Sequence, residues 1–174
     1  SKKENTKKTF KKILKKFKKI DFIISCVGKS NFKKNNNNAV FNEWKTALED
    51  NLISNVNLVN EYLNVFQKKA YNTRIVLISS IAGVQPISAP VSYSTSKSAL
   101  IFFTKMMAKK LAKNKINLNC ISPGNIMIKN NLWEKKMKAN KKKTLKYIKK
   151  NVPLNDFCKP EQIKGLCDYL ISPL

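Results

Sequence analysis

Residues 74–80 read Arg-Ile-Val-Leu-Ile-Ser-Ser, and this stretch decides the class of fold. It holds four apolar residues in a row, three of them β-branched, which predicts a short strand buried on both faces. Two further runs rich in apolar residues lie at residues 20–27 and 116–121, and a glycine follows each within three residues. We therefore expect three buried strands.

Helical patterns separate the expected strands. They cover residues 2–19, 42–69, 92–113 and about 131–150, and a last helix is expected to start near Pro160. Strands that alternate with long helices indicate a parallel sheet. The sequence thus predicts an α/β fold, a three-layer doubly wound parallel sheet of the Rossmann-like type. In such sheets ligands bind beyond the carboxyl ends of the strands.

The composition excludes several classes of function. The chain has 174 residues and a formal net charge of +25, from 35 basic and 10 acidic residues. Arg74 is the one arginine among the basic residues, whereas nucleic-acid interfaces favour the planar guanidinium group. The lysines are spread over every expected helix, so a basic nucleic-acid or membrane-surface binder is the weakest hypothesis. We expect no nucleic-acid partner and no membrane partner.

Metal and disulfide chemistry are not expected either. There is no histidine, and the four cysteines show no Cys-x-x-Cys spacing. Their apolar or mixed surroundings suit reduced thiols in a cytoplasmic protein. No apolar run approaches the roughly 20 residues that span a membrane, and the N-terminus lacks the apolar core of a signal peptide.

The segment Tyr93-Ser94-Thr95-Ser96-Lys97 is the most informative chemical feature. A spacing of four places Tyr93 and Lys97 on one helix face, where a cation favours the phenolate and lowers the pKa of the phenol. A tyrosine of this kind can act as a general acid or base. Ser80 ends the second expected strand, and Asn51 lies in the middle of an expected helix, an unfavourable place for Asn unless its side chain has a role.

These residues resemble the short-chain dehydrogenase/reductase family over the length of the chain. Six ordered segments carry the resemblance: residues 22–28, 51–56, 78–83, 93–97, 121–124 and 152–163. The resemblance implies an oxidoreductase that transfers a hydride between NAD or NADP and an alcohol or ketone. It also implies a homo-oligomer, a dimer or tetramer, formed through the helices at residues 42–69 and 92–113.

The resemblance assigns a role to each candidate residue. Tyr93 would exchange a proton with the substrate oxygen, and Lys97 would lower the pKa of Tyr93 and bind the nicotinamide ribose. Ser80 would orient the substrate oxygen, and Asn51 would hold a water that links Lys97 to solvent. The implied cofactor-binding residues are Cys26, Gly28, Tyr93, Lys97, Pro123, Gly124 and Ile126. Residues 127–150 would form a variable lid, with Met127, Leu132, Trp133 and Met137 as possible pocket residues.

Two departures from the family pattern keep an alternative open. Ser25-Cys26-Val27-Gly28 stands where the family has Asn-Asn-Ala-Gly, and Ile128 replaces a threonine. A non-catalytic relative that binds a dinucleotide or a partner is therefore the runner-up. The family's Gly-rich phosphate-binding turn is absent from these residues, and so is its last strand. We expect residues 1–174 to be a single partial domain of a longer enzyme, incomplete in this chain and inactive in isolation.

Overall fold

The computed structural model describes residues 3–17, 19–30, 40–66 and 72–173. The chain forms two compact units, Ser1–Ser122 with Pro173–Leu174, and Pro123–Ser172. The two units are described in turn.

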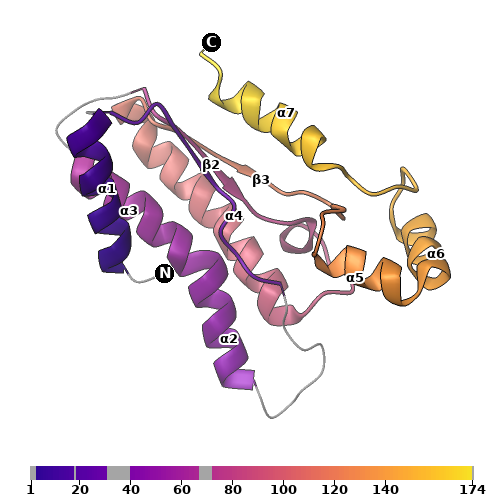
Figure 1. Cartoon of the computed structure of the whole chain (residues 1–174). Coiled ribbons are helices and arrows are strands. Elements are labelled where there is room, and N and C mark those ends of the chain that lie inside the picture. The colour runs from indigo at the N-terminus through magenta and orange to yellow at the C-terminus, as the bar shows by residue number, and fades with distance from the viewer. Residues whose placement is uncertain (1–2, 18, 31–39, 67–71, 174) are drawn as a thin grey trace. The chain divides into compact units, whose positions relative to one another are not determined.

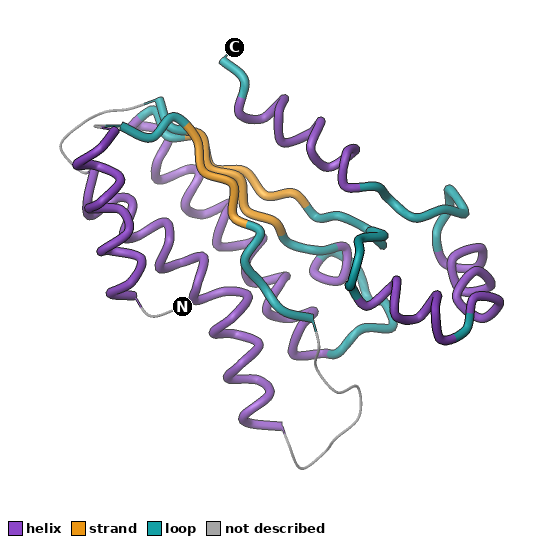
Figure 2. Tube along the Cα trace, in the orientation of Figure 1, coloured by secondary structure: helices purple, strands orange, loops and turns teal. Residues whose placement is uncertain are grey.

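The first unit is built on a parallel sheet of three strands in the order β1-β2-β3. The strands are β1 (Phe22–Ser25), β2 (Arg74–Ile78) and β3 (Asn117–Ile121), and Figure 2 shows them side by side. Each expected strand is confirmed, shortened by one to four residues. The carboxyl ends of the strands meet at one edge, because Ser25 pairs with Leu77 and Leu77 pairs with Cys120.

Three helices of this unit, α1 (Lys3–Phe17), α3 (Ser54–Phe66) and α4 (Val91–Leu111), pack on one face of the sheet (Figure 1). Their apolar side chains meet alternate residues of the strands, since successive side chains of a strand point to opposite faces. The buried cluster is Phe10, Val59, Tyr62, Phe66, Ile75, Leu77, Leu100, Leu111, Ile116 and Leu118. The core therefore holds α4 firmly against β2 and β3.

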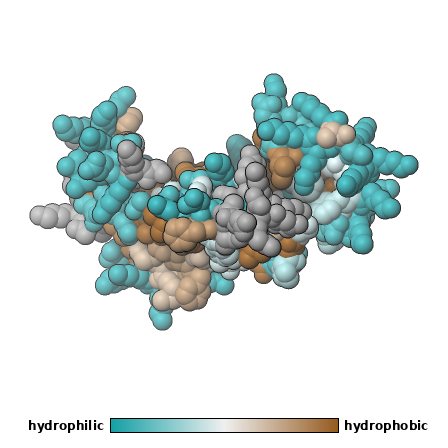
Figure 3. All heavy atoms as spheres, turned by 90° about the horizontal axis from the view of Figure 1, so that it is seen from below, coloured by the Kyte–Doolittle hydropathy of each residue, from teal (hydrophilic) through white to brown (hydrophobic). Residues whose placement is uncertain are grey.

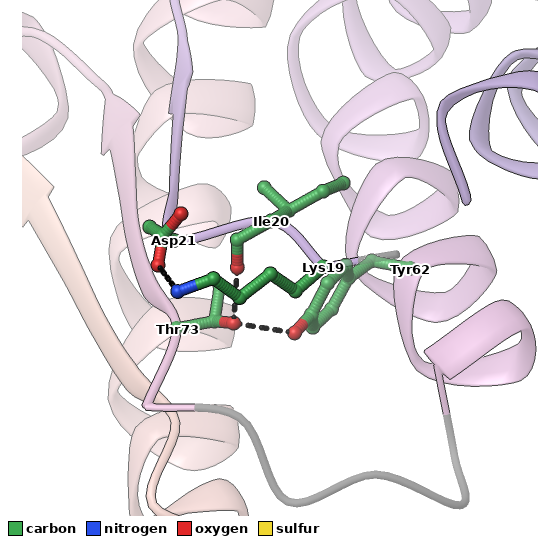
Figure 4. Close-up of polar contacts among 5 residues, drawn as sticks. All are labelled: Lys19, Ile20, Asp21, Tyr62 and Thr73. Carbon is green, nitrogen blue, oxygen red and sulfur yellow. Dashed lines mark hydrogen bonds and ion pairs between the residues drawn. The ribbon is translucent and has the colours of Figure 1, made fainter. Parts of the chain in front are cut away.

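A polar link closes the opposite end of the sheet (Figure 4). The buried Thr73 hydroxyl donates to the carbonyl of Ile20 at 2.7 Å and accepts from the Tyr62 hydroxyl at 2.7 Å. Lys19 and Asp21 form an exposed ion pair next to it. The hydroxyl of Thr73 thus links the starts of β1 and β2 to α3. Because it both donates and accepts a hydrogen bond, this buried hydroxyl is itself satisfied.

The helix expected over residues 42–69 differs from the structure in its middle. It consists of α2 (Val40–Leu48), a π-helical turn at Glu49–Ile53, and α3. Such turns carry an extra residue and occur frequently at functional sites. Asn51 lies inside this turn, which is why its position in the middle of the helix is tolerated.

The second unit holds α5 (Leu132–Ala139), α6 (Lys141–Asn151) and α7 (Pro160–Ile171). The single helix expected near 131–150 is thus two helices. The break is at Asn140, which has an extended backbone and accepts a hydrogen bond from Lys143 N at 2.8 Å, so it acts as the N-cap of α6. The ring of Trp133 packs against those of Tyr147 and Phe157.

Hydrophilic side chains cover most of the face in Figure 3, with apolar side chains exposed between them. Within the described ranges, no helix is both long and apolar enough to cross a membrane. The same residues contain no group of three or more side chains suited to hold a metal ion.

Candidate active site

Ser80 and Tyr93 meet at the carboxyl end of β2. Ser80 is the N-cap of a short 3₁₀ turn, Ile81–Gly83, and its Oγ accepts a hydrogen bond from Ala82 N at 3.2 Å. Tyr93 lies in the first turn of α4, and its side chain shares a hydrogen bond with that of Ser80. The twelve residues between them fold back so that the two hydroxyl groups lie close together.

Lys97 lies one helical turn after Tyr93 and is only 5% exposed. Its Nζ donates a hydrogen bond to the carbonyl of Ile78 at 3.0 Å and lies 6.0 Å from the centre of the Tyr93 ring. Burial lowers the pKa of Lys97 from 10.5 to about 8, and the nearby thiols of Cys120 and Cys26 oppose that shift. The site thus holds a cation that bulk water would stabilise better.

The pKa of Tyr93 departs from the expectation. Burial raises the pKa of Tyr93 above its usual value of 10.0, and the hydrogen bond with Ser80 partly offsets this. Lys97 was expected to lower it, but the ammonium group of Lys97 donates its hydrogen bond to the carbonyl of Ile78, and burial is the largest influence on the pKa of Tyr93. In the protein without a bound nucleotide, the burial of the phenol therefore decides the direction in which the pKa of Tyr93 is shifted.

Asn51 is fully buried and joins the end of β1 to the π-helical turn. Its Oδ1 accepts from Lys29 N at 2.8 Å, and its Nδ2 donates to Lys29 O at 3.1 Å. This reciprocal pair satisfies the backbone of Lys29 as a neighbouring strand would. The amide of Asn51 therefore fixes the segment that follows β1.

Gly28 lies where Asn51 and Lys97 approach each other. A Cβ on Gly28 would be 2.7 Å from Asn51 Oδ1 and 2.9 Å from Lys97 Nζ, which is closer than atoms can pack. The bare Cα keeps this space open beside the ammonium group. Gly28 is the one residue of the family's Asn-Asn-Ala-Gly pattern that the chain keeps, and it is the position where the neighbouring atoms leave no room for a side chain.

We predict that Gly28→Ala strongly weakens the site, because the new methyl group must displace Asn51 or Lys97. Turnover by the protein that carries this chain should fall about 10- to 100-fold, in line with other small displacements of catalytic groups. Steady-state kinetics would measure the loss. Gly165→Ala is the matched control, since a Cβ there meets nothing within 4 Å; equal activities of the two variants would contradict the prediction.

Two buried polar residues that are linked to Asn51 by hydrogen bonds were missed at the level of sequence. The buried Ser25 donates to Asn55 Oδ1 at 2.6 Å, and Asn55 Nδ2 donates to the carbonyl of Asn51 at 2.9 Å. Asn55 is 1% exposed and lies four residues after Asn51. That spacing was the available signal, because a second Asn on the same face of a helix interior also needs a partner.

The remaining candidates divide between the units. Cys26 is exposed at the end of β1, close enough to Lys97 to interact with its charge. Pro123, Gly124 and Ile126 belong to the second unit, where Ile126 forms an isolated parallel bridge with Cys158. In the first unit, the structure thus brings together Asn51, Ser80, Tyr93 and Lys97, next to Gly28.

The hydrogen-bond donors of the first unit suit two neighbouring hydroxyl groups of a sugar. The ammonium group of Lys97 has three protons, and among the described residues one of them is bonded to Ile78 O. The bare Gly28 leaves room next to the others, and the Tyr93 hydroxyl is one helical turn away. These residues could hold the ribose of a nucleotide cofactor.

Known proteins resemble this chain over most of its length. A family model described as Enoyl-(Acyl carrier protein) reductase matches residues 1–174. The 3-oxoacyl-(acyl-carrier-protein) reductase FabG of Buchnera aphidicola is 33% identical over 162 residues, which are 92% of this chain and 62% of that protein. Dehydrogenase/reductase SDR family member 4 of Mus musculus is 27% identical over 171 residues, 97% of this chain and 59% of that protein.

Solved structures show the same fold. ElxO with NADP bound superposes with a TM-score of 0.86 at 21% identity, over 98% of this chain and 67% of that one. A 4-hydroxyisoleucine dehydrogenase complexed with NADH gives a TM-score of 0.82 at 25% identity, over 98% and 69%. The chain therefore has the Rossmann-like fold that the strand pattern predicted, and it spans 62% and 59% of the two relatives' lengths.

Proposed function

We propose that this chain, which belongs to the short-chain dehydrogenase/reductase family, carries the catalytic residues of an oxidoreductase that uses NAD or NADP to interconvert a ketone and an alcohol. The hydrogen bond between Ser80 and Tyr93, with Lys97 buried one helical turn away, carries the proposal. The nicotinamide cofactor would supply or accept the hydride. The protein's part is to bind, orient and move a proton.

Tyr93 is the proton-exchanging group of this proposal. In reduction its neutral phenol donates a proton to the substrate oxygen as negative charge develops there, and in oxidation its phenolate takes the proton back. The raised pKa of Tyr93 keeps the phenol neutral at pH 7, the form that reduction needs. Ser80 keeps its proton, donates a hydrogen bond to the same oxygen and so orients the substrate.

Lys97 and Asn51 support Tyr93. The ammonium group of Lys97 binds ribose hydroxyls and, with a pKa of about 8, can release a proton near neutral pH. Asn51 Oδ1 and Lys97 Nζ both face the space above Gly28. A water held there would link the ammonium group to solvent, so that Tyr93 regains its proton after each turnover.

The second unit would supply contacts to the substrate and to the cofactor. Residues 127–150 would be a lid, with Met127, Leu132, Trp133 and Met137 as contacts, and Pro123, Gly124 and Ile126 would lie against the nicotinamide. The described α5 and α6 in this segment expose mainly lysines and few apolar side chains. The lid therefore suits a substrate with anionic groups.

Relatives suggest where to look for the substrate. The names of FabG and of the acetoacetyl-CoA reductase of Cupriavidus necator, which is 27% identical over 174 residues, both specify 3-oxoacyl thioesters. We therefore propose a ketone of this type, whose phosphate groups the lid lysines would attract. None of the four cysteines forms a disulfide, which suits a cytoplasmic protein, and the exposed Phe102 and Met106 of α4 suit a homo-oligomer interface.

The test uses the protein that carries this chain, acetoacetyl-CoA, and NADPH or NADH in turn. We expect consumption of one of the two nucleotides that depends on the thioester. Nucleotide binding without turnover of any ketone in a panel would favour the non-catalytic alternative, which the departures at Ser25–Gly28 keep open.

A further inference from the structure

The turn that carries Ser80 touches the backbone of Lys97, and none of the roles above uses this contact. A Cβ on Gly83 would lie 2.6 Å from the carbonyl carbon of Lys97 and 2.7 Å from Ser98 N. Both are backbone atoms in the middle of α4, which cannot yield as a flexible side chain would. Any side chain at position 83 must therefore push the turn away from α4.

The turn is the part that would move. α4 is held in the core by Leu100 and Ser96, both fully buried. On the other side of the contact, the turn is short, and Ser79, just before it, donates a hydrogen bond from its Oγ to the carbonyl of Lys97 at 2.9 Å. Ser79 and Gly83 thus hold the same peptide group of Lys97 from the two ends of the turn.

Ser80 lies between these two contacts. It caps the turn through Ala82 N, so a displacement of the turn displaces Ser80 with it. Tyr93 belongs to α4 and would stay in place. A side chain at position 83 would therefore lengthen or break the hydrogen bond between Ser80 and Tyr93.

We infer that Gly83 is a positioning residue: its bare Cα lets the turn rest on the Lys97 peptide, and this contact sets the distance between the hydroxyl groups of Ser80 and Tyr93. The inference rests on the proposed function, because it explains how two of its residues are kept in register. Gly83 itself touches neither substrate nor cofactor.

The test is a double-mutant cycle in the protein that carries this chain. Gly83→Ala should lower kcat about 10- to 100-fold and leave the affinity for the nucleotide, measured by tryptophan fluorescence, within about threefold. If Gly83 acts through Ser80, then Gly83→Ala should have almost no further effect on kcat in a Ser80→Ala background. Gly165→Ala, whose Cβ meets nothing, is the control.

The pH profile gives a second readout that a general loss of stability would not move. The Ser80 hydrogen bond lowers the pKa of Tyr93, so Gly83→Ala should shift the rise of the oxidation rate to higher pH. Should Gly83→Ala fail to fold, Ser79→Ala removes the other contact without adding atoms and should give a smaller shift in the same direction. An unchanged pH profile in the variant that folds, or equal effects of Gly83→Ala with and without Ser80, would overturn the inference. Full activity of Tyr93→Phe would instead overturn the proposed function.

Discussion

Lys97→Met is expected to make the protein inactive and more stable at the same time. The buried ammonium group has its pKa lowered from 10.5 to about 8, and a shift of that size corresponds to on the order of 3 kcal/mol of destabilisation of the folded state. Methionine has a similar length and no charge. After about 1 kcal/mol is subtracted for the lost hydrogen bond to Ile78, the free energy of unfolding should rise by about 2 kcal/mol at pH 7.

The stability that Lys97→Met gains over the wild type should decrease as the pH rises. Below pH 8 Lys97 is protonated in both states, so the folded wild type carries the full penalty. Between about pH 8 and 10.5 the folded state releases this proton while the unfolded state keeps it, so the stability of the wild type rises and the advantage of Lys97→Met fades.

Urea unfolding at pH 7 and pH 10 would measure both effects. Lys105→Met is the matched control, because Lys105 is an exposed residue of the same helix, and it should change stability little. A destabilised and inactive Lys97→Met would show that Lys97 serves structure and not function. A charged side chain that destabilises the folded state is retained when activity needs it.

Tyr93→Phe is expected to remove turnover and leave the fold intact. The change deletes one hydroxyl group, and proton transfer by a positioned side chain contributes about 10²- to 10⁴-fold to a rate. We expect kcat to fall by about 10³-fold. Nucleotide affinity should change far less than kcat, because the Lys97 ammonium group remains to bind the ribose after the Tyr93 hydroxyl is lost.

The control for Tyr93→Phe is Tyr169→Phe, which alters an exposed tyrosine of α7. That variant should keep its activity within about threefold, as surface substitutions generally do. Comparable losses in the two variants would mean that Tyr93 has no special role. Thermal unfolding would show that both variants are folded.

Periodicity and spacing predicted most of the fold because they reflect local physics. The run Ile75–Ile78 could hardly be anything but a buried strand, and Pro160 starts its helix as expected. The π-helical turn and the break at Asn140 were not predicted. Both depend on how a single Asn side chain bonds in three dimensions, and an Asn-rich sequence does not show which of its Asn residues do so.

The candidate site was predicted only in part for the same reason. The four-residue spacing placed Tyr93 and Lys97 on one helix face. The pKa of Tyr93 is raised because the phenol is buried, and spacing does not reveal burial. The contacts of Gly28 and Gly83 are approaches between segments far apart in the chain. Sequence alone marks both as glycines and gives no reason for either.

The most direct test of the proposed chemistry follows the hydrogen itself. NADPH or NADH carrying deuterium at the reactive carbon is mixed with the protein that carries this chain and acetoacetyl-CoA, and the product is examined by mass spectrometry. Hydride transfer at this site predicts one deuterium on the new alcohol carbon in the wild type and almost none over the same time with Tyr93→Phe. Transfer by Tyr93→Phe at the wild-type rate would contradict the role of Tyr93, and nucleotide oxidation without label in the product would contradict hydride transfer.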